Sequence, residues 1–250
     1  MKRNLLKNIF LSLCLVVFPM GMAAKQEATV TSPSGNLTLT AGVDKAGRPY
    51  YSLSRGKEAI LLPSYLGVKL KDGSLDSDFG VMGFVRATKD ETWHQPWGEE
   101  NDVRNHYNEL TMKLAQRKGL KRQLTIVFRV FDDGMGFRYV FPEQKNLKHF
   151  VIMDEETEFC FKGDPEAWTL PYDADYYEGL WTKAPLSKKQ KVCTPITIEA
   201  KPDLYMMLHE ANLTDYASLN VKPVETKEGN VRMRAELVPW SNGDLVRAKA

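Results

Sequence analysis

The sequence predicts an all-β fold of two packed antiparallel sheets, and two observations support this prediction. From Leu37 onward, short runs of alternating apolar and polar residues recur with turn residues between them. The apolar spacing of three and four residues that marks an amphipathic helix is nearly absent. Many short strands at close intervals are typical of a large β-sandwich.

The predicted strands follow in chain order. They lie at residues 37–40, 50–53, 59–62, 65–70, 109–114, 124–131, 137–141, 158–161, 167–170, 195–199, 204–208 and 231–237. The clearest hairpin joins the runs 124–131 and 137–141, because Asp132-Asp133-Gly134 supplies a turn residue that tolerates a positive φ. The two aspartates also resemble a catalytic pair, but their place in a turn favours the structural interpretation.

Polar residues from Ser74 to Asp78 predict a loop after the strand 65–70. The acidic residues of this region, Asp72, Asp76 and Asp78, are a candidate cation site, but solvated loop charge is the favoured interpretation.

The first 23 residues have the pattern of a secretory signal peptide. Basic residues precede an apolar run from Ile9 to Phe18, and small residues end the segment at Ala23. This run is too short to cross a bilayer, and no later segment approaches the ~20 apolar residues that crossing requires. We therefore expect a periplasmic or secreted protein without a membrane span.

Charge argues against two classes of partner. The signal segment contains three basic residues, so the 34 basic and 32 acidic residues of the whole chain become 31 and 32 after its removal. Without a basic excess or a basic run, neither nucleic acid nor an anionic membrane surface is an expected partner.

Two cysteines, Cys160 and Cys193, remain after the signal segment. An exported chain permits a disulfide between them, and a pair of inert buried thiols is the alternative. Their spacing does not match that of zinc ligands.

The segment from Trp93 to Leu110 concentrates aromatic rings, amides, carboxylates and two histidines without a helical or alternating pattern, which predicts an ordered loop leading into a strand. Such side chains suit carbohydrate, because a ring covers the C–H face of a sugar while polar groups bind its hydroxyls. A structural plug that satisfies its own hydrogen bonds is the alternative, and composition alone favours it. A second irregular segment, Pro171 to Leu186, carries Asp173, Asp175, Tyr176, Tyr177 and Trp181 and is predicted to be functional.

The common catalytic motifs are absent from the sequence: we find no phosphate-binding glycine loop, nucleophile elbow or zinc-protease helix. The four histidines, His94, His106, His149 and His209, are scattered. Glu210 follows the apolar strand 204–208 and His209. A carboxylate at this place either points to solvent or has a cation, and the residues alone slightly favour solvent.

Three motifs resemble glycoside hydrolase family 97, which contains secreted α-glucosidases and α-galactosidases related to the starch-utilisation α-glucosidase. They are residues 97–110 (Trp-Gly-Glu-Glu to Asn-Glu-Leu), residues 128–139 (Phe-Arg-Val-Phe-Asp-Asp-Gly-Met-Gly-Phe-Arg-Tyr) and residues 208–216 (Leu-His-Glu-Ala to Asp-Tyr). They occur in the family's order and span most of the chain after the signal segment, whereas residues 171–191 match poorly.

The resemblance implies a galactose-mutarotase-like β-super-sandwich that precedes a (β/α)₈ catalytic barrel. Residues 24–240 would form the sandwich and residues 241–250 would begin a linker toward the missing barrel. The family's catalytic carboxylates lie on the barrel, so the resemblance implies no catalytic residue in this chain. Glu210 matches the glutamate that the sandwich contributes to an active-site calcium, and the expected substrate is an α-linked oligosaccharide.

One alternative function remains open from the residues. A freestanding carbohydrate-binding or mutarotase-like sandwich would use His209 or His106 with Glu210 for proton transfer.

Overall fold

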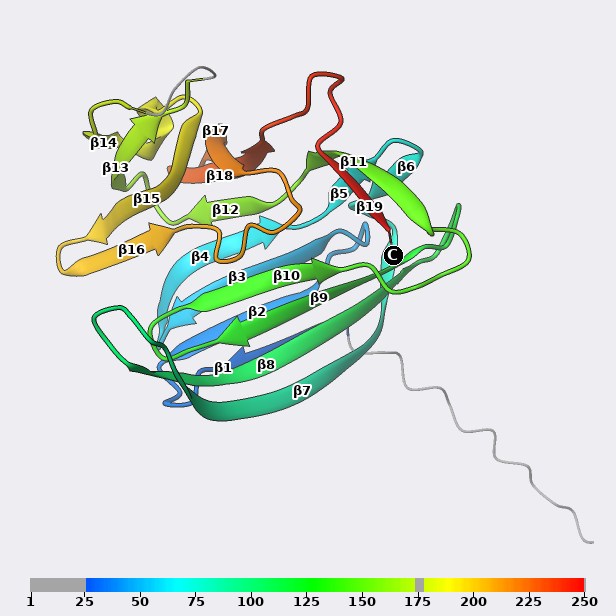
Figure 1. Cartoon of the computed structure of the whole chain (residues 1–250), viewed down its shortest axis with the longest axis horizontal. Helices are drawn as coiled ribbons and strands as arrows, with labels where there is room; N and C mark the ends of the chain where they lie inside the picture. Colours follow the sequence, from blue (N-terminus) through cyan, green and yellow to red (C-terminus); the bar gives the residue numbers. More distant parts are fainter. Residues whose placement is uncertain (1–25, 174–177, 250) are drawn as a thin grey trace, which may run out of the picture.

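The computed structural model describes residues 26–173 and 178–249. The signal segment and residues 174–177 of the second irregular segment, which include Asp175, Tyr176 and Tyr177, lie outside these ranges. The described residues form nineteen strands and one short 3₁₀ turn, η1 (Leu186–Lys188) (Figure 1). They contain no helix that is long and apolar enough to cross a membrane.

Eleven of these strands form one large antiparallel sheet. Its order is β1 (Glu27–Thr31), β2 (Leu37–Val43), β3 (Pro49–Arg55), β4 (Glu58–Tyr65), β12 (Glu158–Phe161), β18 (Asn230–Leu237), β17 (Leu219–Lys227), β15 (Val192–Lys201), β13 (Glu166–Pro171) and β14 (Thr182–Pro185), while β16 (Leu204–Leu208) pairs with β15. Two four-stranded sheets complete the fold. One has the order β10 (Met135–Val140), β9 (Gln123–Val130), β8 (Asp102–Gln116), β7 (Phe79–His94), and the other has the order β19 (Val246–Lys249), β11 (His149–Glu155), β5 (Val68–Leu70), β6 (Gly73–Leu75).

The core lies where strands β1–β4 face the β10–β9–β8–β7 sheet. Alternate residues of β2 and β9, such as Leu39 and Ile126, are fully buried, as the period-two pattern of these segments predicted. Tyr51 of β3 contacts two rings of the opposite sheet, with its ring centroid 6.1 Å from that of Phe128 and 5.4 Å from that of Phe137. Each buried side chain of this kind stabilises the fold by about 1.5–3 kcal/mol. The predicted all-β sandwich is confirmed.

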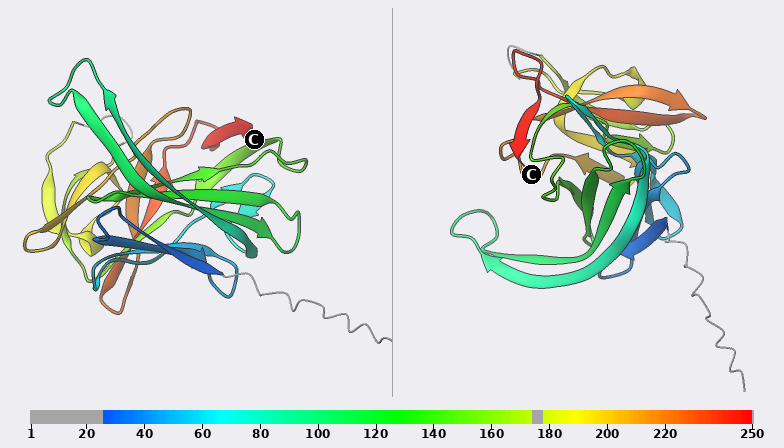
Figure 2. Two further views of the ribbon diagram at one scale, coloured as in Figure 1. Left: turned by 90° about the horizontal axis from the view of Figure 1, so that it is seen from below. Right: turned by 90° about the vertical axis from the view of Figure 1, so that its right-hand side faces the viewer.

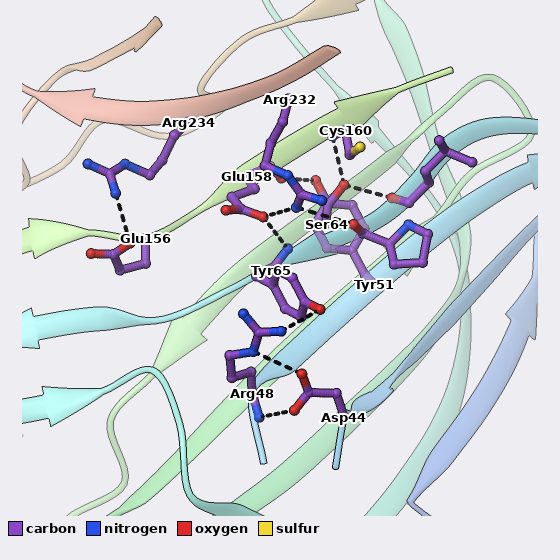
Figure 3. Close-up of polar contacts among 12 residues, drawn as sticks. Asp44, Arg48, Tyr51, Ser64, Tyr65, Glu156, Glu158, Cys160, Arg232 and Arg234 are labelled. Atoms are coloured by element: carbon purple, nitrogen blue, oxygen red, sulfur yellow. Dashed lines mark hydrogen bonds and ion pairs between the residues drawn. The ribbon is translucent and has the colours of Figure 1, made fainter. Parts of the chain in front are cut away.

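A short pairing joins the two halves of the large sheet. Strand β12 pairs with β4 only at Cys160 and Phe161. Side chains around Glu158 strengthen this junction (Figure 3). The Glu158 carboxylate accepts a hydrogen bond from the Tyr65 amide at 3.1 Å and pairs with the Arg232 guanidinium, while the Cys160 amide donates to Ser64 Oγ at 2.9 Å.

Strands β7 and β8 continue well beyond the sandwich. Because β9 pairs with β8 only from Asn108 to Ala115, residues 89–107 form a two-stranded projection, which we call the arm. Figure 2 shows the arm leaving the body of the molecule, with its tip curled to the side on which the C-terminal end lies. Every β7 residue from Val85 onward is exposed. Along β8 the arm is partly covered, and Tyr107 at its base is buried, but the β7 strand of the arm has no buried side chain and therefore no alternating pattern.

The structure corrects two predictions. The predicted loop 74–78 contributes Ser74 and Leu75 to strand β6, because Leu75 is fully buried in the core. The segment 241–250, expected to begin a linker, instead contains β19, which pairs with β11 because Leu245 and Val246 are buried.

The two cysteines are not joined by a disulfide. Cys160 lies in β12 and Cys193 in β15, and strands β18 and β17 separate them. Three strand spacings amount to about 14 Å, which exceeds the Cα separation that a disulfide spans.

Candidate functional site

Glu210 lies directly after β16, in the ten-residue loop 209–218 that leads to β17. Its carboxylate is half-buried, and Oε2 accepts a hydrogen bond from the Leu219 amide at 3.1 Å. Within the described ranges, no lysine, arginine or histidine forms an ion pair with it. A carboxylate in this environment favours a cation, because partial burial weakens its hydration.

A second carboxyl group, that of Glu155 at the end of β11, lies close enough for the charge of Glu210 to act on it. It is 8% exposed and accepts hydrogen bonds from two hydroxyl groups, Thr157 Oγ1 at 2.6 Å and Tyr216 Oη at 2.6 Å. Thr157 is in turn hydrogen-bonded to the Tyr139 hydroxyl at 2.7 Å, which also accepts the Gly67 amide at 3.0 Å.

Burial raises the pKa of the Glu155 carboxyl above its ordinary value of 4.5. The hydrogen bonds from Thr157 and Tyr216 oppose this rise, and the negative charge of Glu210 adds to it. Burial, followed by the charge of Glu155, also raises the pKa of the Tyr216 hydroxyl. Tyr216 therefore stays protonated and donates to Glu155.

Sequence reasoning missed Glu155. It stands in the run Asp154-Glu155-Glu156, and nothing in that run distinguishes the buried carboxyl from its neighbours. Lys69 pairs with both Asp154 and Glu156, whereas no cation among the described residues pairs with Glu155.

Calcium takes about six to eight oxygen ligands. Among the residues that the structure describes, no group of three or more histidine, cysteine, aspartate or glutamate side chains is arranged to hold a metal. Glu210 fits the role of one ligand in a site that other groups complete, because its carboxylate is half-buried and no cationic side chain of the described residues neutralises it.

The side chains of the aromatic segment, Trp93 to Leu110, lie in different environments. Tyr107 is a structural plug: it is 4% exposed, its ring lies 5.2 Å from that of Phe131, and the Arg129 guanidinium lies 4.6 Å above it. Trp93 and Trp97 are 49% and 82% exposed on the arm and at its tip. The predicted loop is limited to the turn 95–101. The backbone amide of Gln95 closes this turn by donating to the Asn101 carbonyl at 2.8 Å.

Polar side chains pair along the arm. Arg104 makes a two-pronged contact with Asp90 at 2.8 and 2.7 Å, and Nδ1 of His94 lies 3.1 Å from the Asp102 carboxylate. His209 is exposed, and within the described residues it makes no hydrogen bond to Glu210. The structure does not bring His106 and Glu210 into contact.

Three of the other acidic candidates bind protein groups. Asp132 accepts the Ser34 amide at 2.8 Å, which supports the turn interpretation. Asp72 binds Arg122, whereas Asp76 accepts hydrogen bonds from Ser74 Oγ and Ser77 Oγ. In the second irregular segment, Trp181 is 51% exposed and Asp173 is exposed as well.

A family model described as the glycosyl-hydrolase 97 N-terminal domain matches residues 30–241, which is most of the chain. The chain belongs to this family. Its sandwich, arm and β16–β17 loop are therefore those of a glycosyl-hydrolase 97 N-terminal domain, and the resemblance inferred from the three motifs is confirmed.

The relatives that resemble this chain in sequence include two α-galactosidases. A retaining α-galactosidase from Bacteroides thetaiotaomicron is 28% identical over 94% of the chain, which covers 35% of that protein. A probable retaining α-galactosidase from Streptomyces bingchenggensis is 26% identical over 72% of the chain, which covers 28% of that protein. The chain thus spans about a third of the length of these relatives.

Solved structures give the same proportion. A glycoside hydrolase family 97 enzyme from Pseudoalteromonas sp. strain K8, solved in complex with acarbose, is 31% identical with a TM-score of 0.82. The match covers 89% of this chain and 34% of that enzyme. A β-arabinopyranosidase at 22% identity and a TM-score of 0.80 shares the fold.

Proposed function

We propose that this chain is the non-catalytic amino-terminal domain of a secreted, exo-acting α-glycosidase, an α-glucosidase or an α-galactosidase. A catalytic barrel in the same polypeptide would supply the two carboxylates that cleave an α-linked oligosaccharide. The relatives support this proposal, because they are named as glycosidases and are about three times as long as the region that the chain matches.

The arm is the structural observation that carries the proposal. Two-stranded ribbons are marginally stable in water by themselves, yet this one leaves the side chains of its β7 strand exposed and places Trp93 and Trp97 at its far end. A following domain packed against the arm would cover these rings. The arm tip and the C-terminal end project toward the same face of the molecule (Figure 2), at opposite ends of its long axis (Figure 1).

The proposed role of Glu210 is to provide one oxygen ligand to a calcium ion that the barrel's carboxylates complete. When bound, the ion would supply a fixed positive charge beside the sugar pocket and link the two domains. The half-buried carboxylate without a cationic neighbour supports this role. Secretion to the periplasm or beyond is proposed from the signal-like first 23 residues.

Activity assays test the proposal. The purified chain should not hydrolyse aryl α-glucosides or α-galactosides above background, whereas the polypeptide that continues through the barrel should. Turnover by the chain alone that disappears in Glu210→Gln would show that the chemistry resides in this domain and would contradict the proposal.

Exposure of Trp97 favours one alternative, a freestanding carbohydrate-binding module. Calorimetry with maltooligosaccharides separates the two functions. A glycosidase domain should bind them weakly, and Trp97→Ala should not change the affinity. Tight binding that Trp97→Ala removes would establish the module.

A further inference from the structure

The loop 209–218 has no regular secondary structure, and residues 211–215 are all exposed. Two side-chain hydrogen bonds hold it in place within the described structure, beside a backbone hydrogen bond from the Val238 amide to the Ser218 carbonyl at 3.3 Å. The first is the hydrogen bond from the Leu219 amide to Glu210, which closes the loop across nine residues. The second is the hydrogen bond from the Tyr216 hydroxyl to the Glu155 carboxyl.

The second contact ties the loop to a buried, hydrogen-bonded part of the molecule. Glu155 pairs with Val68 in the β11–β5 ladder, so its backbone is fixed by a neighbouring strand. Its side chain is fixed by Thr157, which is 2% exposed and is bonded to Tyr139 of β10. The hydroxyl of Tyr216 thus reaches a preorganised acceptor in the core.

Tyr216 also packs its ring against the core beside Ala217 and Leu219. Five exposed residues separate it from Glu210, and two residues separate it from Leu219. Release of Tyr216 would therefore free the loop between β16 and β17 (Figure 1), and the contact between Glu210 and the Leu219 amide would no longer be held from both sides.

We propose that Glu155 and Tyr216 form a buried clamp that fixes the loop 209–218 and thereby sets the position at which Glu210 presents its carboxylate. Both are positioning residues that act through Glu210. The clamp rests on the proposed calcium role of Glu210, and it adds two residues that the family resemblance did not assign.

The first test measures the loop without calcium. Tyr216→Phe removes the hydroxyl and keeps the ring. We expect the Leu219 amide to exchange with solvent about tenfold faster in this variant, as the loss of one buried hydrogen bond implies. Hydrogen exchange of the purified chain, followed by NMR, measures this rate.

Tyr51→Phe is the matched control. It removes a buried tyrosine hydroxyl that donates to the Glu158 carbonyl at 2.9 Å, outside the loop. Both variants should lower the thermal stability of the chain, but only Tyr216→Phe should accelerate exchange at Leu219. An unchanged Leu219 rate in Tyr216→Phe, or an equal acceleration in both variants, would overturn the clamp.

The second test measures calcium affinity by calorimetry in the polypeptide that includes the catalytic barrel. Tyr216→Phe should weaken calcium binding about tenfold relative to Tyr51→Phe, and Glu210→Gln should weaken it further. If Glu210→Gln weakens binding and Tyr216→Phe does not, the positioning role is wrong. If Glu210→Gln leaves the affinity unchanged, the calcium role fails and the positioning role fails with it, while the exchange result still decides whether the loop is clamped.

Discussion

The junction between β4 and β12 gives a prediction that can be worked through from the contacts. The Glu158 carboxylate accepts from the Tyr65 amide and pairs with Arg232, and the two charged side chains are only 15% and 20% exposed. Glu158→Ala removes both contacts at the place where the two halves of the large sheet share a pairing of two residues.

Hydrogen bonds to charged groups contribute about 1.5–3 kcal/mol each. The remaining exposure of the pair lowers the value of its ionic part, so we expect Glu158→Ala to lower the free energy of unfolding by about 2–3 kcal/mol. In a domain of this size, each kcal/mol shifts Tm by about 2–4 °C. Urea unfolding and thermal melting of the purified chain measure the loss.

Glu58→Ala is the control, because it removes a surface contact with Lys201 at 2.6 Å whose side chains are 41% and 50% exposed. Its effect should be much smaller. A double-mutant cycle with Arg232→Met should also show that the loss of Glu158 costs less once Arg232 is absent. Equal losses in Glu158→Ala and Glu58→Ala would refute the view that the junction depends on Glu158.

Further predictions concern pH and the backbone. Burial raises the pKa of Glu155 above 4.5, so its contribution to stability is complete below that pH and is lost as the pH rises through the folded-state pKa. Relative to Glu155→Gln, the natural chain should therefore lose stability on going from pH 4 to neutral pH, and parallel melting curves would contradict this. The Arg122 guanidinium lowers the pKa of Asp72 below 3.8, so this pair stabilises the fold above that value and is lost on acidification; Asp72→Asn should show a smaller acid-induced fall in Tm. Gly47→Ala should destabilise the fold far more than Gly35→Ala, although φ is +76° at position 47 and +78° at position 35. Only at position 47 would the new Cβ lie 2.5 Å from a backbone nitrogen of β7. Similar urea midpoints for the two variants would contradict this.

The sequence predicted the strands in which burial of one face imposes a regular spacing of apolar residues. The strands β12 and β16 have the predicted bounds, Glu158–Phe161 and Leu204–Leu208, and the β9–β10 hairpin turns at Asp132–Gly134 as expected. In these elements one face meets the core or the turn needs particular residues, so the local sequence carries the information.

Other elements escaped prediction because they lack that signal. Strand β17 contains Pro223 directly after Lys222, and an irregularity in its pairing with β18 at that point accommodates the proline. In the arm, every residue of β7 is exposed, so this strand has no alternation of buried and exposed residues. Its length became visible only once β7 was seen to pair with β8 over fifteen positions.

The sequence by itself determined the fold class, the family resemblance and the choice of Glu210. Only the tertiary structure decided which carboxyl group lies near Glu210. Glu155 and its hydrogen-bond partner Tyr216 are 61 positions apart along the chain, so no local pattern links them. Burial, which raises the pKa of Glu155 and makes its hydroxyl partners necessary, is created when β11, β10 and the β16–β17 loop pack together. No local run of residues encodes that environment, since desolvation depends on what the rest of the chain places around the group.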